Sequence, residues 1–152
     1  MKRLYAIISV LFLCFLCAGC SEESKYEKAV ALYKEGNFAE AEELFYKLGN
    51  YEDSEALKKK SDIMGKLQGT YVGTENGKGG FTIDKFEAQY KGDLDPPFPF
   101  EVNDEGTIVT FYQETDFNEP YETEWELSFN KDFKPVLERD LLGARISYTL
   151  QD

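Results

Sequence analysis

The sequence predicts an α+β chain in which a helical hairpin and a third helix precede a small antiparallel β-barrel or sandwich. Between residues 24 and 66, apolar residues recur at helical spacing and glycines mark the breaks. From residue 67 onward the pattern changes to short runs of apolar and polar alternation separated by turn residues, which is typical of β-strands. Residues 1–19 form an apolar leader, and we exclude them from the fold.

The leader has the three parts of a secretory signal. Lys2 and Arg3 give it a positive start, and an apolar run with a single polar residue extends from there to Ala18. The run is shorter than the ~20 residues that a membrane-spanning helix needs. Small residues at its end suit a signal peptidase, so we expect cleavage after Gly19, which leaves Cys20 as the first residue.

The end of the leader, Leu-Cys-Ala-Gly-Cys, resembles the lipobox of bacterial lipoproteins. Ala18, Gly19 and Cys20 match that motif, whereas Cys17 stands where leucine is usual. The resemblance implies that the sulfur of Cys20 accepts a diacylglyceryl group, with acyl chains such as palmitate. Two such chains anchor a protein stably. Together with the secretory signal, the resemblance implies a location on the extracytoplasmic face of the cell membrane. The alternatives are an ordinary secreted protein and an uncleaved anchor.

Missing residue types exclude several kinds of chemistry. The chain has no histidine, which excludes Ser-His and Cys-His catalysis and histidine ligands for zinc. All its cysteines lie at or before position 20, so the remainder can form no disulfide. Loss of Lys2 and Arg3 would shift the net charge from −12 to −14. We expect no nucleic-acid partner, because so acidic a chain is repelled by phosphates.

The helical segment carries signals for helix starts and ends. Ser24 and Glu27 fit a capping box at the start of the first helix. Gly36 permits the positive φ that ends helices, and Asn37 and Glu40 form a second capping box directly after it.

A third helix follows the break at Gly49. Its start is expected at Asp53 or Ser54. The apolar positions expected to pack the three helices together are Tyr26, Ala29, Val30, Tyr33, Phe38, Ala41, Leu44, Phe45, Leu48, Ala56, Leu57, Ile63, Met64 and Leu67.

The first two helices resemble a tetratricopeptide repeat. The small residues of the resemblance would lie where the helices approach closely, and the aromatic residues would fill the space between them. The usual closing proline is absent, and only one repeat is visible, although solenoids generally need three or more. The hairpin is therefore either a docking site for a peptide or a spacer. The matching residues are Ala29, Leu32, Gly36, Phe38, Ala41, Phe45 and Leu48.

The remainder of the chain is acidic and aromatic. Residues 67–152 hold 14 of the 23 aromatic residues and a net charge of −11. Within residues 121–129, aromatic and aliphatic residues alternate with Glu122, Glu124 and Glu126, which predicts one buried and one exposed face. We expect strands over residues 69–74, 80–90 (with a break at Asp84-Lys85 left open), 98–102, 107–113, 121–129, 135–138 and 145–151.

The first of these strands resembles the opening strand of lipocalin-like domains. Residues 67–73, Leu-Gln-Gly-Thr-Tyr-Val-Gly, place a glycine, one residue and the aromatic Tyr71 in the order typical of that family. The resemblance implies a β-barrel over residues 67–152. It does not establish a cavity for a ligand.

Three groups of residues could carry chemistry. Residues 93–95 and 103–106 contain oxygen ligands for calcium, but neither has the spacing of a calcium-binding loop, and a hairpin turn explains the second. Glu122, Glu124 and Glu126 lie ~7 Å apart along one strand face, a separation used by glycosidases, but an exposed face does not raise the pKa of a general acid. The aromatic residues could line a groove, although a domain this small needs them for its core.

We therefore expect a signal peptide over residues 1–19, a lipidated cysteine and linker over 20–23, a tetratricopeptide-like segment over 24–66 and a lipocalin-like domain over 67–152. The function expected is that of a non-catalytic binding or adaptor lipoprotein, with the membrane and an envelope protein or peptide as partners. No cofactor, metal site or catalytic residue is expected, and no small ligand or binding residue is assigned. The alternatives are a carboxylate-dependent hydrolase and a small-ligand carrier.

Overall fold

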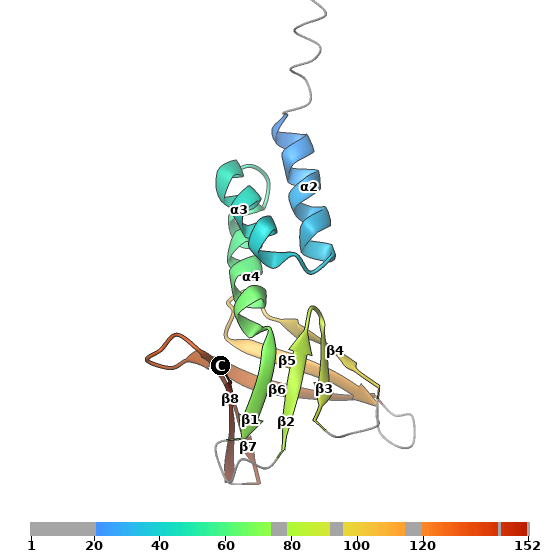
Figure 1. The fold of residues 1–152 in the computed structure, drawn as a ribbon, viewed down its shortest axis with the longest axis vertical. Coiled ribbons are helices and arrows are strands. Elements are labelled where there is room, and N and C mark those ends of the chain that lie inside the picture. The colour runs from blue at the N-terminus through green and yellow to red at the C-terminus, as the bar shows by residue number, and fades with distance from the viewer. Residues whose placement is uncertain (1–20, 74–78, 92–95, 115–119, 143, 152) are drawn as a thin grey trace, which may run out of the picture. The chain divides into compact units, whose positions relative to one another are not determined.

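A computed structural model describes residues 21–73, 79–91, 96–114, 120–142 and 144–151 (Figure 1). The chain forms two compact units, one up to Lys58 and one from Lys59 onward. In the described residues three helices are followed by eight antiparallel strands that close into a barrel, so the predicted α+β fold is confirmed and the sheet is a barrel rather than a sandwich.

The first unit is built on a helical hairpin. Its helices are α2 (Glu22–Lys34) and α3 (Phe38–Leu48). The small side chain of Ala29 from α2 is buried together with Ala41 and Phe45 from α3, so the two helices can approach closely. Partly buried apolar side chains pack around this cluster. Those that the helical spacing predicts are Tyr26, Val30, Tyr33, Leu44 and Leu57, and Leu32 and Tyr51 join them.

Neither of the two predicted capping boxes forms as expected. The first helix is capped by Ser21, whose hydroxyl accepts from the backbone N–H of Ser24 at 3.2 Å, so the helix begins two residues before Ser24. Asn37 is the cap residue of α3, but its side chain makes no capping hydrogen bond and instead donates to the carboxylate of Glu35. The predicted helix end is right, because Gly36 has a φ of +83°.

The barrel is an antiparallel meander in which each strand pairs with the next and the last pairs with the first (Figure 1). Closure comes from three residue pairs that join the first strand to the last, Tyr71 with Leu150, Val72 with Thr149 and Gly73 with Tyr148. The strands are β1 (Gly69–Gly73), β2 (Gly80–Asp84), β3 (Glu87–Tyr90), β4 (Phe98–Val102), β5 (Ile108–Glu114), β6 (Pro120–Phe129), β7 (Pro135–Leu141) and β8 (Ala144–Leu150).

The open question of a break after Asp84 is settled in favour of two strands. Lys85 has a φ of +55° and turns the chain back, so that Asp84 pairs with Glu87 in a tight hairpin. The side-chain amide of Gln68, at the start of the barrel, accepts from the backbone N–H of Lys85 at 2.5 Å and donates to its carbonyl at 3.2 Å. The break makes the number of strands even, which an antiparallel barrel of this kind needs for closure.

The second half of the third helix, α4 (Ser54–Leu67), packs against one end of the barrel. Lys59 donates from Nζ to the carbonyl of Glu105 at 2.9 Å, in the turn between β4 and β5. Gly106 in that turn has a φ of +70°, and a Cβ added to it would come within 2.2 Å of the Ile63 side chain. Glycine is therefore favoured there chiefly by the backbone conformation, since the Ile63 atom in the way is the end of a side chain that can shift.

Aromatic rings fill the barrel interior. Tyr71 stacks on Phe81 with ring centres 4.8 Å apart, and its buried hydroxyl donates to the carbonyl of Leu67. Phe81 also contacts Phe111 and Tyr148 edge-on, at 5.6 and 5.2 Å. Each ring thus touches others across the barrel, and these contacts use the large apolar area that a small domain without disulfides needs for its core.

Candidate functional site

The outer surface of four neighbouring strands carries a cluster of carboxylates. In β6, Thr123, Trp125 and Leu127 are buried, so the glutamates that alternate with them point outward. Strand pairing places outward residues of the neighbouring strands beside those glutamates. We call this surface the acidic face, and its members are Glu101, Glu122, Glu124, Glu126, Glu138 and Asp140.

The register explains why the acidic face forms. Glu126 pairs directly with Glu138 on β7, and like charges in directly opposed positions repel each other. Arg145 enters from β8, where it pairs with Asp140. Its side chain extends across β7 and meets both glutamates, so it offsets this repulsion at one point of the surface.

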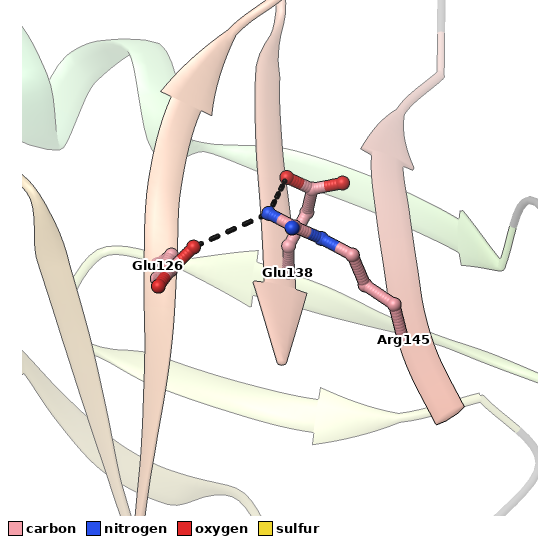
Figure 2. A network of polar contacts seen from close by, with 3 residues as sticks. All are labelled: Glu126, Glu138 and Arg145. Carbon is pink, nitrogen blue, oxygen red and sulfur yellow. Dashed lines mark hydrogen bonds and ion pairs between the residues drawn. The ribbon is translucent and has the colours of Figure 1, made fainter. Parts of the chain in front are cut away.

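Figure 2 shows the three side chains, which come from three adjacent strands. Arg145 donates from Nη2 to Glu138 at 2.8 Å and to Glu126 at 3.3 Å. The bond to Glu138 is the main reason that the pKa of Arg145 is raised above its usual value. The side chain of Glu126 remains 72% exposed and that of Glu138 27% exposed, so both carboxylates stay within reach of a binding partner.

The sheet is hollowed at this place. The hollow has a volume of about 520 Å³, and five carboxylates and two arginines contribute to its wall. A wall of this kind suits a partner with positive charge, since carboxylates in excess create a negative local potential. The lining residues are Ile108, Glu122, Glu124, Trp125, Glu126, Glu138, Arg139, Asp140 and Arg145.

The negative charge of the acidic face affects the pKa of Tyr112. It lies on β5 opposite Glu122, and its hydroxyl donates to the carboxylate of Glu101 at 3.3 Å. Partial burial and then the charges of Glu101, Glu122 and Glu124 raise the pKa of Tyr112 above its usual value. The carboxylates of two strands, β4 and β6, therefore act together on one hydroxyl group.

The predicted trio Glu122, Glu124 and Glu126 is brought together as expected, but on an open surface. All three side chains are exposed, and that of Glu126 is already held by Arg145. A general acid needs an enclosed, apolar setting that keeps its proton at neutral pH. The open surface therefore suits this trio to contact with a positively charged partner, and it does not provide the enclosed setting that a general acid needs.

Arg139, the second arginine in the lining of the hollow, contacts aromatic side chains. The guanidinium carbon of Arg139 lies 6.0 Å from the ring centre of Trp125, and the group donates to the Tyr121 hydroxyl at 3.3 Å. The aromatic residues considered for a groove occupy the interior themselves, since Trp125 contacts Phe111 and Tyr148.

The two calcium hypotheses meet different outcomes. Asp93 and Asp95 lie outside the described residues. In the second, the Asn103 side chain organises a hairpin turn, because Oδ1 accepts from the N–H groups of Thr107 and Ile108 and Nδ2 donates to Glu105. In the described part of the chain no group of three or more acidic, histidine or cysteine side chains is placed to hold a metal ion.

Cys20, the predicted site of lipidation, also lies outside the described residues, as does the leader. Within the described ranges no helix has the length and apolar character needed to cross a membrane.

Sequence reasoning missed the residues that complete the acidic face. Glu101, Glu138, Asp140 and Arg145 come from strands β4, β7 and β8, and none belongs to a recognisable motif. The signal that could have found them is the hairpin register, because residues at equal distances from a tight turn lie opposite each other.

No family model matches the chain, and neither a curated protein nor a solved structure matches it.

Proposed function

We propose that the chain is a lipid-anchored binding module on the extracytoplasmic side of the cell membrane, without catalytic function. The observation that carries the binding role is the hollow of about 520 Å³ on the acidic face. The anchor is supported by the lipobox-like residues before Cys20 and by the positive, apolar leader. The partner that fits is an envelope protein or peptide with a cationic segment.

Several features support binding on the outside of the barrel. The interior is occupied by the protein's own rings, of which Tyr71, Phe81, Phe111 and Trp125 are buried. The fold is consistent with a lipocalin-like domain, but these rings take up the space in which a small ligand would lie. The carboxylates, by contrast, are accessible at the surface, where charge steers a partner into the complex.

The helical hairpin is assigned a secondary role. Its likeness to one tetratricopeptide repeat rests on Ala29, Ala41 and Phe45, which are buried between the helices. Since those side chains are used within the hairpin, we propose that it serves as a spacer between anchor and barrel. A docking role would need exposed residues beyond this set.

The test is capture of partners from envelope extracts by the lipidated protein and two charge variants. In the first variant, Glu122, Glu124 and Glu126 become glutamine. In the second, the same charge is removed from the helices by changing Glu23, Glu27 and Glu40 to glutamine. We expect the first variant to lose about tenfold in affinity, since three exposed charge contacts of about 0.5 kcal/mol each are removed. The second variant should bind as the unaltered protein does.

The sign of the effect at Arg145 provides a further check. Arg145→Gln removes a positive charge from the acidic face, so capture of a cationic partner should strengthen. Equal loss in both triple variants would show a general charge effect and contradict a role for the acidic face. Mass spectrometry of the native protein tests lipidation separately. An unmodified Cys20 would contradict the lipid anchor, whatever the result of capture.

A further inference from the structure

The barrel is open along part of the boundary between β6 and β7. Among the residues that the structure describes, these two strands pair only over residues 126–129 and 135–138. On their other sides they stay paired beyond this part, β6 with β5 and β7 with β8. Residues 120–125 and 139–141 therefore have no partner strand across the boundary, and in Figure 1 β6 and β7 run in different directions there. We call the space between these two edges the open seam.

The charges of the two strands explain why their pairing stops. At the last pair Glu126 lies opposite Glu138, and Arg145 contacts both carboxylates (Figure 2). If the same register continued, Glu124 would come to lie opposite Asp140. Like charges in directly opposed positions repel each other, so continued pairing is disfavoured.

The hollow of the acidic face lies at the open seam. Its wall includes the outward residues Glu124 and Asp140, and also Trp125 and Arg139, which share the inner side of the sheet with buried Leu137. A hollow on an unbroken sheet would be lined from one face only, because successive side chains point to opposite faces. The lining from both faces shows that the hollow reaches between the two strands.

The backbone of β6 presents hydrogen-bonding groups to the open seam. The N–H of Leu127 donates to the carbonyl of Thr107 at 2.7 Å, on the side of β5. In an antiparallel pair, the backbone groups of alternate residues point to the same side, so those of the other inner residues of β6 also point to β5. The N–H and carbonyl groups of Glu122 and Glu124 therefore point into the seam. A strand edge of this kind is a template for a further strand.

We propose that the open seam binds an extended peptide as an added strand, antiparallel to β6, in which lysine or arginine alternates with apolar residues. This inference rests on the proposed function, since it specifies how a cationic segment binds at the acidic face. Peptide residues opposite Glu122 and Glu124 place their side chains on the outer face, where cations meet carboxylates. The residues between them point inward, towards Trp125. A second copy of the chain does not fit, because it would bring the same carboxylates together.

The test compares synthetic peptides of equal charge. The first alternates three lysines with three valines, the second has the same residues in two blocks, and both are acetylated and amidated. Two further peptides carry N-methyl groups on the alternating sequence, either at the lysines or at the valines. In the proposed strand the lysine N–H groups face β6, whereas those of valine face away. Fluorescence of Trp125, the single tryptophan, measures binding to the purified protein, because Trp125 lines the hollow.

We expect the alternating peptide to bind at least about tenfold more tightly than the block peptide, since only matched faces allow the backbone hydrogen bonds to form. N-methylation at lysine should weaken binding by about tenfold, and N-methylation at valine by less than about threefold. Hydrogen exchange at the amide of Glu124 should slow when the alternating peptide is bound.

A pair of variants tests the same contact from the side of the protein. Glu124→Gln and Glu124→Pro both remove the charge, but only proline removes the N–H group that points into the seam. Proline is tolerated at a strand edge where the N–H makes no bond within the sheet, so the barrel should form, and circular dichroism checks this. We expect the proline variant to bind the alternating peptide at least about tenfold less tightly than the glutamine variant does.

Equal binding of the alternating and block peptides, or equal effects of the two N-methylations, would overturn the added strand. Such a result would leave the acidic face as a surface that attracts cations, and capture of partners from envelope extracts would still test the proposed function. Absence of binding by every peptide would also overturn the added strand. The peptide results do not require the proline variant to fold.

Discussion

At the scale of single residues, Tyr26 joins the start of the helical hairpin to the segment before α4. Its hydroxyl donates to the carboxylate of Asp53, and its ring packs edge-on against Phe45 and Tyr51. The hydrogen bond to Asp53 is the largest cause that raises the pKa of Tyr26 to about 12. Because the carboxylate stabilises the protonated phenol, this contact exists only while Tyr26 keeps its proton.

Alkaline titration tests this contact. The pKa of Tyr26 is higher in the folded chain than the ~10 of an unfolded tyrosine, so the contribution to stability is complete below pH ~10. It is lost as the pH rises towards about 12. We expect Asp53→Asn to lower the pKa of Tyr26 towards ~10, measured by tyrosinate absorbance. Asp132→Asn, which lies in the barrel, is the control, and identical titration curves for both variants would contradict the assignment.

At the scale of elements, α3 shows how a short helix is held. Its eleven residues are too few for a helix to be stable alone in water, so packing must stabilise it. Phe38, Ala41, Phe45 and Leu48 provide one buried stripe. Phe45 is fully buried, whereas its neighbour Tyr46 is 70% exposed.

Phe45→Ala should destabilise the helical unit by about 3–5 kcal/mol, because it removes a large buried ring and leaves a cavity. We expect helical circular dichroism to be lost at lower denaturant concentration, while the fluorescence of Trp125 in the barrel unit changes little. Tyr46→Ala is the matched control and should have a small effect on both signals. A shared transition for both signals in Phe45→Ala would show that the two units unfold as one.

The elements also show how far sequence patterns reach. The alternation in β6 is confirmed for Thr123, Trp125 and Leu127, which are buried, whereas Tyr121 and Phe129 are partly exposed. Tyr121 and Phe129 lie near the two ends of β6, where each is covered only in part, Tyr121 by Arg139 and Phe129 by Lys66. Sequence periodicity predicts on which side of the strand a side chain lies. The exposed fraction of that side chain depends on which other residues pack against it.

At the scale of the whole molecule, excess negative charge opposes folding. The chain has 29 acidic and 17 basic residues, and six carboxylates gather on the acidic face. Compaction brings these charges together, so self-repulsion reduces the free energy of unfolding. Salt at 0.15 M screens charges beyond ~8 Å and should relieve this repulsion.

We therefore expect the melting temperature to rise as sodium chloride is added from low concentration to about 0.15 M, measured by calorimetry. The variant with glutamine at positions 122, 124 and 126 should start higher and rise less. A melting temperature that falls with salt would mean that ion pairs such as Arg145 with Glu138 outweigh the repulsion.

The sequence by itself determined the helices, most of the strands and the switch from helix to strand near residue 67, because periodicity and turn residues act over a few positions. It also revealed the acidic stripe on β6 and the leader that predicts an anchor at Cys20. Local patterns could not show that β1 would pair with β8, since those strands are separated by the whole domain.

Only the tertiary structure decided that the sheet closes and that Arg145 meets Glu126 and Glu138 from another strand. The turn at Lys85 depends in the same way on Gln68, 17 residues earlier. Such contacts form where strand register brings distant residues opposite each other, and register is a property of the folded sheet rather than of any single stretch of chain.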